Sequence, residues 1–274
     1  MLPLKRADIE SAPTKRTERK AKFMKILMLA SELDMGGAET HIETLCRELS
    51  RRGEEVVVAS GGGRVAERLK RSGIKHIAIK RPTKAPTDLL FTWWDIYKII
   101  KEEKPDLAHA HTRVTALAAH AACRAAGVPL VTTAHALFSM TPTLARLSRW
   151  GELTAAVSED IKEHLILRGG VPCDKIRVIE NGVFVPDEVR KKRGGHSVLF
   201  VSRMDSDCSL GAYLLCEIAP TLAKRYPDVT VTLVGGGAEL EGLREAARHA
   251  NRRVGRSVVK VAGRVDDPSM FFES

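Results

Sequence analysis

The sequence predicts an α/β protein with two parallel, doubly wound sheets, and three observations support this fold. First, short apolar runs alternate with amphipathic helical segments along most of the chain. Second, a polar, glycine-bearing segment, PDEVRKKRGGH at 186–196, interrupts the alternation, which then restarts. Third, glycine clusters follow several predicted strands, as in turns that lead from a strand into a helix. After the interruption only three further strands are expected.

These observations divide the chain into four segments. Residues 1–23 lack periodicity and are expected to form a basic, disordered tail. Residues 24–185 are expected to form a complete Rossmann-like domain, and 186–196 a linker. Residues 197–274 are expected to form part of a second Rossmann-like domain.

The apolar periodicity places each element in order. In the first domain the expected strands are 26–30, 55–59, 75–79, 107–110, 128–133, 153–157 and 175–179. The expected helices there are 39–49, 65–71, 89–101, 114–126 and one that starts after Ser158. Gly127 is a natural helix C-cap, and Ser158 a natural N-cap. The second domain is expected to contain strands 197–202, 229–234 and 257–262 and helices 210–225 and 238–250.

Charge is concentrated at the start of the chain. The formal net charge is +10, and Met1–Lys25 holds eight lysine or arginine residues against three acidic ones, a net +5. Two interpretations stay open: a start codon upstream of the true start at Met24, or a basic arm for an anionic membrane surface or nucleic acid. Because no recognition motif accompanies the charge, no specific nucleic-acid partner is expected.

The five cysteines form no C-x-x-C pair, so no zinc site is expected. No secretion signal is recognisable, and no stretch approaches the roughly 20 apolar residues of a spanning helix. These features predict a cytoplasmic protein with reduced thiols.

The stretch from Lys25 to His41 has the physical features of an anion site. A buried strand leads to Gly36 and Gly37, which let a ligand approach the backbone, and a helix follows whose free N–H groups favour negative charge. The alternative is an ordinary strand-to-helix turn. The dinucleotide fingerprint G-x-G-x-x-G is absent.

Ligands of open α/β sheets bind outside the carboxyl ends of the strands. The residues expected there are Gly36, Gly37, His109, His111, His135, Ser158, Asn181, Arg203 and Gly235–Gly237. His109 and His111 share one strand face, where metal ligation, a structural role and substrate contact are the alternatives. No third metal ligand is evident from the spacing.

Two of these residues have sharper alternatives. His135 is either a capped structural histidine or a group that handles protons or contacts a sugar. Arg203 would either hold a diphosphate bidentately or form a surface ion pair with Asp205 or Asp207. Gly235–Gly237 before a predicted helix is a second phosphate-type turn, although Leu240 replaces the third glycine of a dinucleotide motif.

Taken together, these stretches resemble glycosyltransferase family 4, the retaining GT-B sugar-nucleotide transferases. The resemblance runs from about Met24 to the end. The matching stretches are MGGAE at 35–39, KPDLAHAH at 104–111, PLVTTAH at 129–135, VSED at 157–160, KIRVIENG at 175–182, VSRMD at 201–205, VGGG at 234–237 and VAGRV at 261–265.

The resemblance implies a GT-B-like fold and a set of roles. His135 would contact the transferred sugar near the anomeric centre, and Arg203 would neutralise the diphosphate leaving group. The donor-phosphate positions would be Gly36, Gly37, Arg203, Cys208, Gly235 and Gly236. The backbone at Arg264 and Val265 would face the nucleobase, and His111 and Asn181 would lie on the acceptor side.

The implied reaction passes a sugar from a nucleoside-diphosphate sugar to a glycan or lipid-linked acceptor with retention of configuration. It would use no metal or other cofactor, and no D-x-D motif appears. Family members often act on cell-surface glycans at the inner membrane face, so peripheral contact with an anionic membrane is a further expectation.

Two departures from the family pattern give an alternative. Cys208 stands where the family usually has a lysine, and losing one charge-assisted bond costs about 1.5–3 kcal/mol. The chain also ends before the glutamate motif that holds the donor in the family. It is therefore a fragment, one of two chains that together complete the second domain, or a non-catalytic nucleotide-sugar-binding or partner-docking module.

Overall fold

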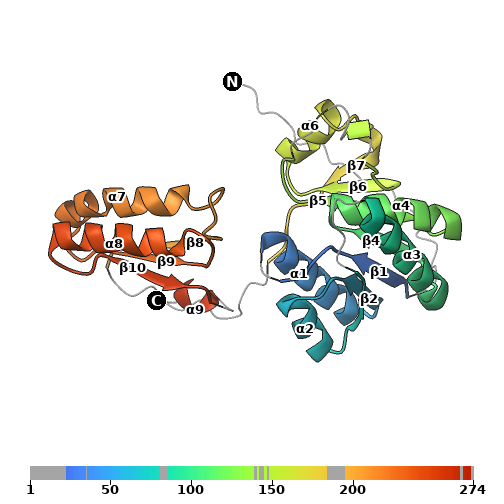
Figure 1. Cartoon of the computed structure of the whole chain (residues 1–274), viewed down its shortest axis with the longest axis horizontal. Helices are drawn as coiled ribbons and strands as arrows, with labels where there is room; N and C mark the ends of the chain where they lie inside the picture. The colour runs from blue at the N-terminus through green and yellow to red at the C-terminus, as the bar shows by residue number, and fades with distance from the viewer. Residues whose placement is uncertain are drawn as a thin grey trace, which may run out of the picture. The chain divides into compact units, whose positions relative to one another are not determined.

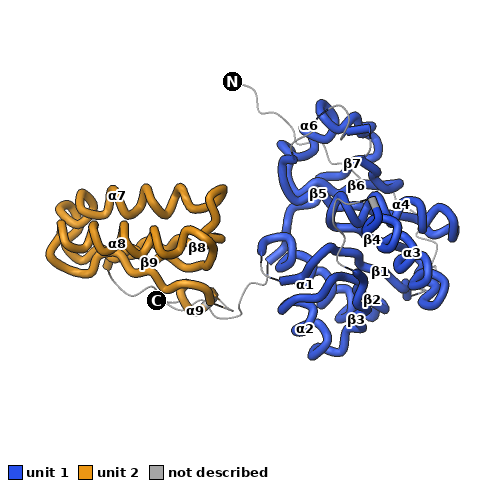
Figure 2. The backbone as a smooth tube through the Cα atoms, viewed as in Figure 1, with its two compact units in different colours: residues 1–184 blue, residues 185–274 orange. Residues whose placement is uncertain are grey.

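The computed structural model describes residues 23–34, 36–80, 86–138, 141, 145–146, 148–183, 195–265 and 268–272. The chain divides into two compact units, Met1–Phe184 and Val185–Ser274 (Figure 2). The expected tail at 1–23 lies outside the described residues except for Phe23, and the expected linker at 186–196 lies outside them except for Gly195 and His196.

Unit 1 contains a seven-stranded parallel sheet in the order β3-β2-β1-β4-β5-β6-β7. Its strands are β1 Lys25–Leu29, β2 Glu55–Ser60, β3 Lys75–Ala78, β4 Leu107–Ala110, β5 Leu130–Ala134, β6 Leu153–Ala156 and β7 Ile176–Val178. Its helices are α1 Gly37–Arg51, α2 Arg64–Arg71, α3 Pro86–Glu103, α4 Arg113–Ala126, α6 Glu159–Leu167 and the short 3₁₀ helix η1 Cys173–Lys175.

Helices cover both faces of this sheet (Figure 1). Alternate residues of β1 point to opposite faces: Ile26 and Met28 pack with α1 and α2, whereas Leu27 and Leu29 pack with α3 and α4. Burial on both faces explains why the strands appear in the sequence as continuous apolar runs.

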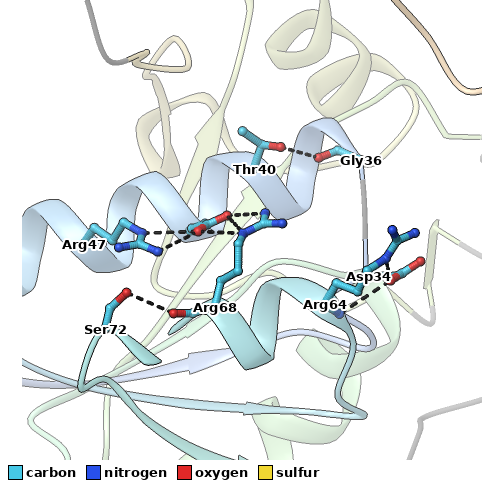
Figure 3. Close-up of polar contacts among 8 residues, drawn as sticks. Asp34, Gly36, Thr40, Arg47, Arg64, Arg68 and Ser72 are labelled. Atoms are coloured by element: carbon cyan, nitrogen blue, oxygen red, sulfur yellow. Dashed lines mark hydrogen bonds and ion pairs between the residues drawn. The ribbon is translucent and has the colours of Figure 1, made fainter. Parts of the chain in front are cut away.

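Ion pairs fasten α1 to α2 (Figure 3). The Glu43 carboxylate, with a side chain 13% exposed, accepts hydrogen bonds from Arg47 on its own helix and from Arg68 on α2. Burial raises the pKa of Glu43, but these two guanidinium groups outweigh it and the net pKa is lowered. Asp34, just before the glycine loop, pairs with Arg64 at 3.1 Å. The residue before the glycine loop and the helix after it are thus both paired with α2.

Unit 2 contains a three-stranded parallel sheet in the order β10-β9-β8. Its elements are β8 Ser197–Val201, α7 Leu210–Arg225, β9 Thr230–Val234, α8 Leu240–Val254, β10 Val259–Gly263 and the short helix α9 Ser269–Phe272. Its core joins one face of the sheet to α7 and α8, which pack against each other (Figure 1). The predicted α/β class with two Rossmann-like parallel sheets, the second a partial one, is confirmed.

The predicted strands and helices are present, with boundary shifts of a few residues. Gly127 is left-handed at the end of α4, and the Ser158 hydroxyl accepts from the Ile161 N–H at the start of α6, which confirms both predicted caps. One two-residue shift at a site is in α8, which begins at Leu240 and not at Ala238. The Ala238 N–H donates to Asp205 and the Glu239 N–H to the Met204 carbonyl, so these residues form a turn.

Within the described residues, no helix combines the length and apolar composition needed to cross a bilayer.

Candidate functional site

The carboxyl end of the unit 1 sheet has a topological switch point between β1 and β4. From β1 the chain continues to β2 and β3 on one side, and from β4 to β5, β6 and β7 on the other. The segments after the two strands contact each other: the His111 N–H donates to the Leu29 carbonyl, and the Ser31 and Thr112 hydroxyls lie 2.8 Å apart. Ligands of open α/β sheets bind at such points.

The glycine loop borders this point. Gly36 is the N-cap of α1 with extended backbone, and the Thr40 hydroxyl donates to its carbonyl (Figure 3). A Cβ added at Gly36 would meet the Glu39 carboxylate at 2.4 Å, whereas Gly37 has open space around it. The start of α1 therefore already holds a carboxylate of its own. No side chain caps the first N–H groups of α1 in the described part of the chain, and the predicted anion site stays a prediction.

Four histidine rings gather at the same end of the sheet. His109 lies in β4, and His111 directly follows it, with ring centroids 4.1 Å apart. The His111 Nδ1 lies 3.1 Å from Nε2 of His135, which follows β5. His41 of α1 packs 5.1 Å from the His135 ring, centroid to centroid. We call these four residues the histidine cluster.

Burial keeps the histidine cluster uncharged at neutral pH. Desolvation lowers the pKa of His109 to about 4 and that of His135 to about 4, with neighbouring histidines adding to the effect. It also lowers the pKa of His41, and places the pKa of fully buried His111 well below its usual range. The cluster therefore offers hydrogen bonds, not positive charge, to a ligand.

Two buried ring nitrogens of the cluster have no hydrogen-bond partner among the residues that the structure describes. They are Nε2 of His111 and Nδ1 of His135, both buried. Each neutral imidazole carries one N–H, and only one hydrogen fits between Nδ1 of His111 and Nε2 of His135. The ring that accepts this hydrogen bond therefore carries its own N–H on its other nitrogen, where no acceptor is described. If His111 donates, that N–H is Nδ1–H of His135, whose ring is the more exposed of the two. This arrangement avoids an orphan donor on fully buried His111.

The three interpretations of His109 and His111 can now be compared. His109 Nε2 lies 2.8 Å from the Thr133 hydroxyl, a structural contact. In the described part of the chain, no group of three histidine, cysteine or acidic side chains is arranged to hold a metal ion. His111, in contrast, contacts His135, the ring for which the family resemblance implies a sugar contact.

Asn181 lies elsewhere on the edge. It follows β7, the outermost strand, and is exposed, with β5 and β6 between its strand and β4. Three strand spacings amount to roughly 14 Å. The structure therefore does not bring Asn181 together with His111, although both were expected on the acceptor side.

In unit 2 the corresponding edge carries Arg203, just after β8. Its guanidinium pairs with Asp205 and with Asp207, each at 3.3 Å. The Cys208 sulfur lies 3.4 Å from the same group. The surface ion pair considered from the sequence is thus present with both acidic residues. A diphosphate would have to compete with them for Arg203.

The glycines after β9 allow close packing against the segment after β8. A Cβ at Gly235, whose φ is +144°, would lie 1.8 Å from the Ser202 carbonyl oxygen. A Cβ at Gly237 would lie 2.3 Å from that of Met204. The turn at 237–239 separates these glycines from α8, so the helix begins two residues later than expected, and the phosphate-binding role of the glycines stays a prediction.

The same edge continues to β10. A Cβ at Gly236 would lie 2.8 Å from Cβ of Arg264, which with Val265 follows β10. The Met204 N–H donates to the Gly236 carbonyl. The carboxyl ends of three adjacent strands therefore bring Arg203, Gly236 and Arg264 to one edge.

The match to a family model decides which family this architecture represents. The model of Glycosyltransferase Family 4 matches residues 35–185. The chain belongs to Glycosyltransferase Family 4. The matched residues begin at the glycine loop and include the whole histidine cluster.

Curated relatives agree with this family. A human phosphatidylinositol N-acetylglucosaminyltransferase subunit is 29% identical over 236 residues, which is 77% of this chain and 48% of the human protein. Its Arabidopsis thaliana counterpart is 28% identical over 248 residues, 81% of this chain and 55% of that protein. The chain thus spans about half the length of these relatives.

Solved structures share the fold. A glycosyltransferase from Rickettsia africae superposes with a TM-score of 0.75 at 22% identity, covering 92% of this chain and 71% of that one. Anabaena Alr3699/HepE, solved in complex with UDP and glucose, gives a TM-score of 0.70 at 21% identity, covering 91% and 72%.

The sequence-based site omitted His41. It lies in the first turns of α1, and the apolar periodicity of that helix does not indicate that its side chain faces the site. The only available signal was its place in the stretch that follows the glycine pair, MGGAETH. Its contacts with His111 and His135 depend on how α1 packs on the sheet.

Proposed function

We propose that this Glycosyltransferase Family 4 chain takes part in passing a sugar from a nucleoside-diphosphate sugar to a lipid-linked or glycan acceptor, with retention of configuration. The observation that carries the proposal is the unit 2 edge, where Arg203, Gly236 and Arg264 meet at the ends of three parallel strands. This edge offers a guanidinium group, which can bind phosphate oxygens, and a glycine backbone that a ligand can approach closely. Both features suit a diphosphate.

Arg203 would stabilise the leaving group. As the bond between the sugar and the diphosphate breaks, negative charge grows on the departing phosphate oxygen, and a cation placed there lowers the barrier. In the free protein Asp205 and Asp207 hold the guanidinium. The donor diphosphate would replace them as the partner of Arg203.

His135 would contact the transferred sugar. Its lowered pKa keeps the ring neutral, so it would donate a hydrogen bond from Nδ1 to a sugar oxygen. A neutral ring would not compete with Arg203 as a cation for the diphosphate. The new bond forms from the acceptor hydroxyl oxygen to the anomeric carbon, on the face that the diphosphate leaves, as the bond from that carbon to the diphosphate breaks. The hydroxyl proton would pass to the departing phosphate oxygen.

The relatives suggest the donor and acceptor. The similar HepE structure contains UDP and glucose, and the two curated relatives are named for N-acetylglucosamine and phosphatidylinositol. We therefore propose a UDP-linked donor and a lipid acceptor, used at the cytoplasmic face of a membrane. Because both relatives are named as subunits, we also propose a partner chain.

Calorimetric titration with UDP, GDP and ADP tests the donor site. We expect UDP to bind, and Arg203→Ala to weaken binding by about tenfold or more, since a charge-assisted bond is lost. The matched control is Arg252→Ala, an exposed arginine on α8 away from the strand ends. Equal affinity in both variants would remove Arg203 from the proposal.

A second function is a non-catalytic nucleotide-sugar-binding or docking module. It is favoured by Cys208 at the position of the family lysine and by the two acidic partners of Arg203. Binding of UDP without release of UDP from a UDP-sugar, even with a lipid acceptor and partner chain present, would identify this function.

A further inference from the structure

His111 and His135 lie ring against ring at the carboxyl end of the unit 1 sheet. Nδ1 of His111 is 3.1 Å from Nε2 of His135, and the two ring planes are inclined by 25°. His111 follows β4 and is 3% exposed, whereas His135 follows β5 and is partly exposed. Because β4 and β5 are paired neighbours, the sheet fixes the backbone from which each ring extends. The contact is therefore a fixed feature of the strand ends.

The burial of His111 decides which ring donates the hydrogen bond. Its Nε2 has no hydrogen-bond partner among the described residues. An N–H at that nitrogen would be a buried donor without an acceptor, which protein interiors rarely contain. The hydrogen of His111 is therefore on Nδ1 and points at Nε2 of His135. Since His135 accepts at Nε2, its own hydrogen must be on Nδ1.

We propose that His111 is a positioning residue that holds His135 in the Nδ1–H tautomer. A histidine side chain in water prefers the Nε2–H tautomer, so the contact with His111 reverses the ordinary preference. Nδ1 of His135 then presents a hydrogen-bond donor that no described residue accepts. A sugar oxygen would supply the missing acceptor, and this last step rests on the proposed function.

This role differs from the acceptor-side contact that the family resemblance implies for His111. A side chain that is 3% exposed offers an acceptor molecule little surface, so its effect on a substrate would pass through His135. The tautomer also limits what His135 can do. With Nε2 occupied and Nδ1 protonated, the ring has no free nitrogen to receive a proton, so we expect it to orient the sugar and not to act as a general base.

Two substitutions at position 111 separate the hydrogen-bond donor from the bulk of the ring. His111→Asn keeps an N–H donor close to the place of Nδ1, because its amide nitrogen is also attached to Cγ. His111→Leu keeps the branch at Cγ but has no donor. His109→Gln is the matched control, because it changes the adjacent ring of the cluster, which lies 2.8 Å from the Thr133 hydroxyl.

The test is nuclear magnetic resonance of the ring nitrogens in the full chain, labelled with ¹⁵N-histidine, at pH 7. Burial lowers the pKa of both rings well below 7, so each carries a single hydrogen there. The His135 signals are those that disappear in His135→Gln. We expect His135 to have a protonated Nδ1 and a bare Nε2 in the wild type, in His111→Asn and in His109→Gln, and the reverse in His111→Leu.

The wild-type spectrum decides the matter even if a variant fails to fold. A protonated Nε2 on His135 in the wild type would overturn the proposal, and so would an unchanged tautomer in folded His111→Leu.

Calorimetric titration separates this inference from the proposed function. We expect UDP, which lacks the sugar, to bind the wild type and both variants at position 111 alike. UDP-glucose or UDP-N-acetylglucosamine, whichever binds the wild type more tightly, should bind His111→Leu about threefold to tenfold more weakly, and His111→Asn should restore most of the difference.

The outcomes of the two experiments distinguish the two proposals. A reversed tautomer in His111→Leu without weaker binding of the UDP-sugar would overturn the role of His111 in sugar contact. Absence of UDP binding to the wild type, together with the expected tautomers, would contradict the proposed donor site and support the positioning role of His111 toward His135.

Discussion

The two units use the same strand order in different ways. In unit 1, β3-β2-β1 continues through four more strands, and both faces of the sheet are apolar and covered by helices. In unit 2, β10-β9-β8 repeats only the first part of that order. Its register aligns Val198, Val231 and Val259 on the face that packs against α7 and α8, but Leu199, Thr232 and Lys260 on the other.

The candidate sites of the two units differ in burial and charge. The histidine cluster is buried and neutral, so packing fixes its geometry. The Arg203 site is exposed and charged, and its own acidic neighbours hold it. A buried neutral site is suited to orienting a sugar, whereas an exposed charged one responds readily to a diphosphate. The comparison teaches that the carboxyl end of a parallel sheet can supply either kind of site. Which kind it supplies depends on how deeply the neighbouring elements bury its side chains.

The largest expected effect comes from breaking one unit at a time. Gly235→Ala drives a Cβ into the Ser202 carbonyl and should destabilise unit 2 by about 3 kcal/mol or more. Gly151→Ala, whose Cβ would lie 2.0 Å from the Leu130 carbonyl oxygen, should do the same to unit 1. Denaturant unfolding followed by tryptophan fluorescence reports unit 1 alone, because all three tryptophans lie there, and circular dichroism reports both units.

Gly182→Ala is the control, since its Cβ would meet nothing within 4 Å. If Gly235→Ala shifted the tryptophan transition as much as Gly151→Ala does, the two units would not be energetically separate.

A smaller effect should come from acid. The folded pKa of His109, about 4, lies below the ordinary 6.5, so the unfolded state binds protons first as pH falls. The stability of unit 1 is then complete above about pH 6.5 and declines toward pH 4, by about 2 kcal/mol at pH 5 from His109 alone. Unfolding at pH 7 and pH 5, followed by tryptophan fluorescence, measures this decline.

His109→Gln keeps an amide for the Thr133 hydroxyl and should remove part of the acid sensitivity. The described histidines of unit 2, His196 and His249, are exposed. An unchanged pH dependence in the variant would argue against a buried, neutral His109.

The smallest expected effect is a change in UDP affinity at the Arg203 site. Cys208→Lys would place a second cation beside Arg203 and should tighten UDP binding about tenfold, equivalent to ~1.4 kcal/mol. Ser206→Lys adds the same charge to the same turn and serves as the control in calorimetry. Equal gains from both substitutions would mean that general charge, and not the position of residue 208, limits the site.

Local patterns in the sequence were sufficient for the elements and several of their ends. The apolar runs gave the strands, Gly127 and Ser158 gave helix caps, and the spacing of His109 and His111 placed both rings on one strand face. Each of these depends on residues that are neighbours along the chain, where backbone geometry fixes the relation between side chains.

Only the tertiary structure decided which of these residues meet. His111 contacts His135 because β5 pairs with β4 in a particular register, and His41 joins them through the packing of α1. The spacing of Arg203, Asp205 and Asp207 permitted the ion pairs, but the turn after β8 brought both acidic groups onto one guanidinium. Strand order, register and burial are properties of the whole chain, and they set the contacts and pKa values that the local pattern leaves open.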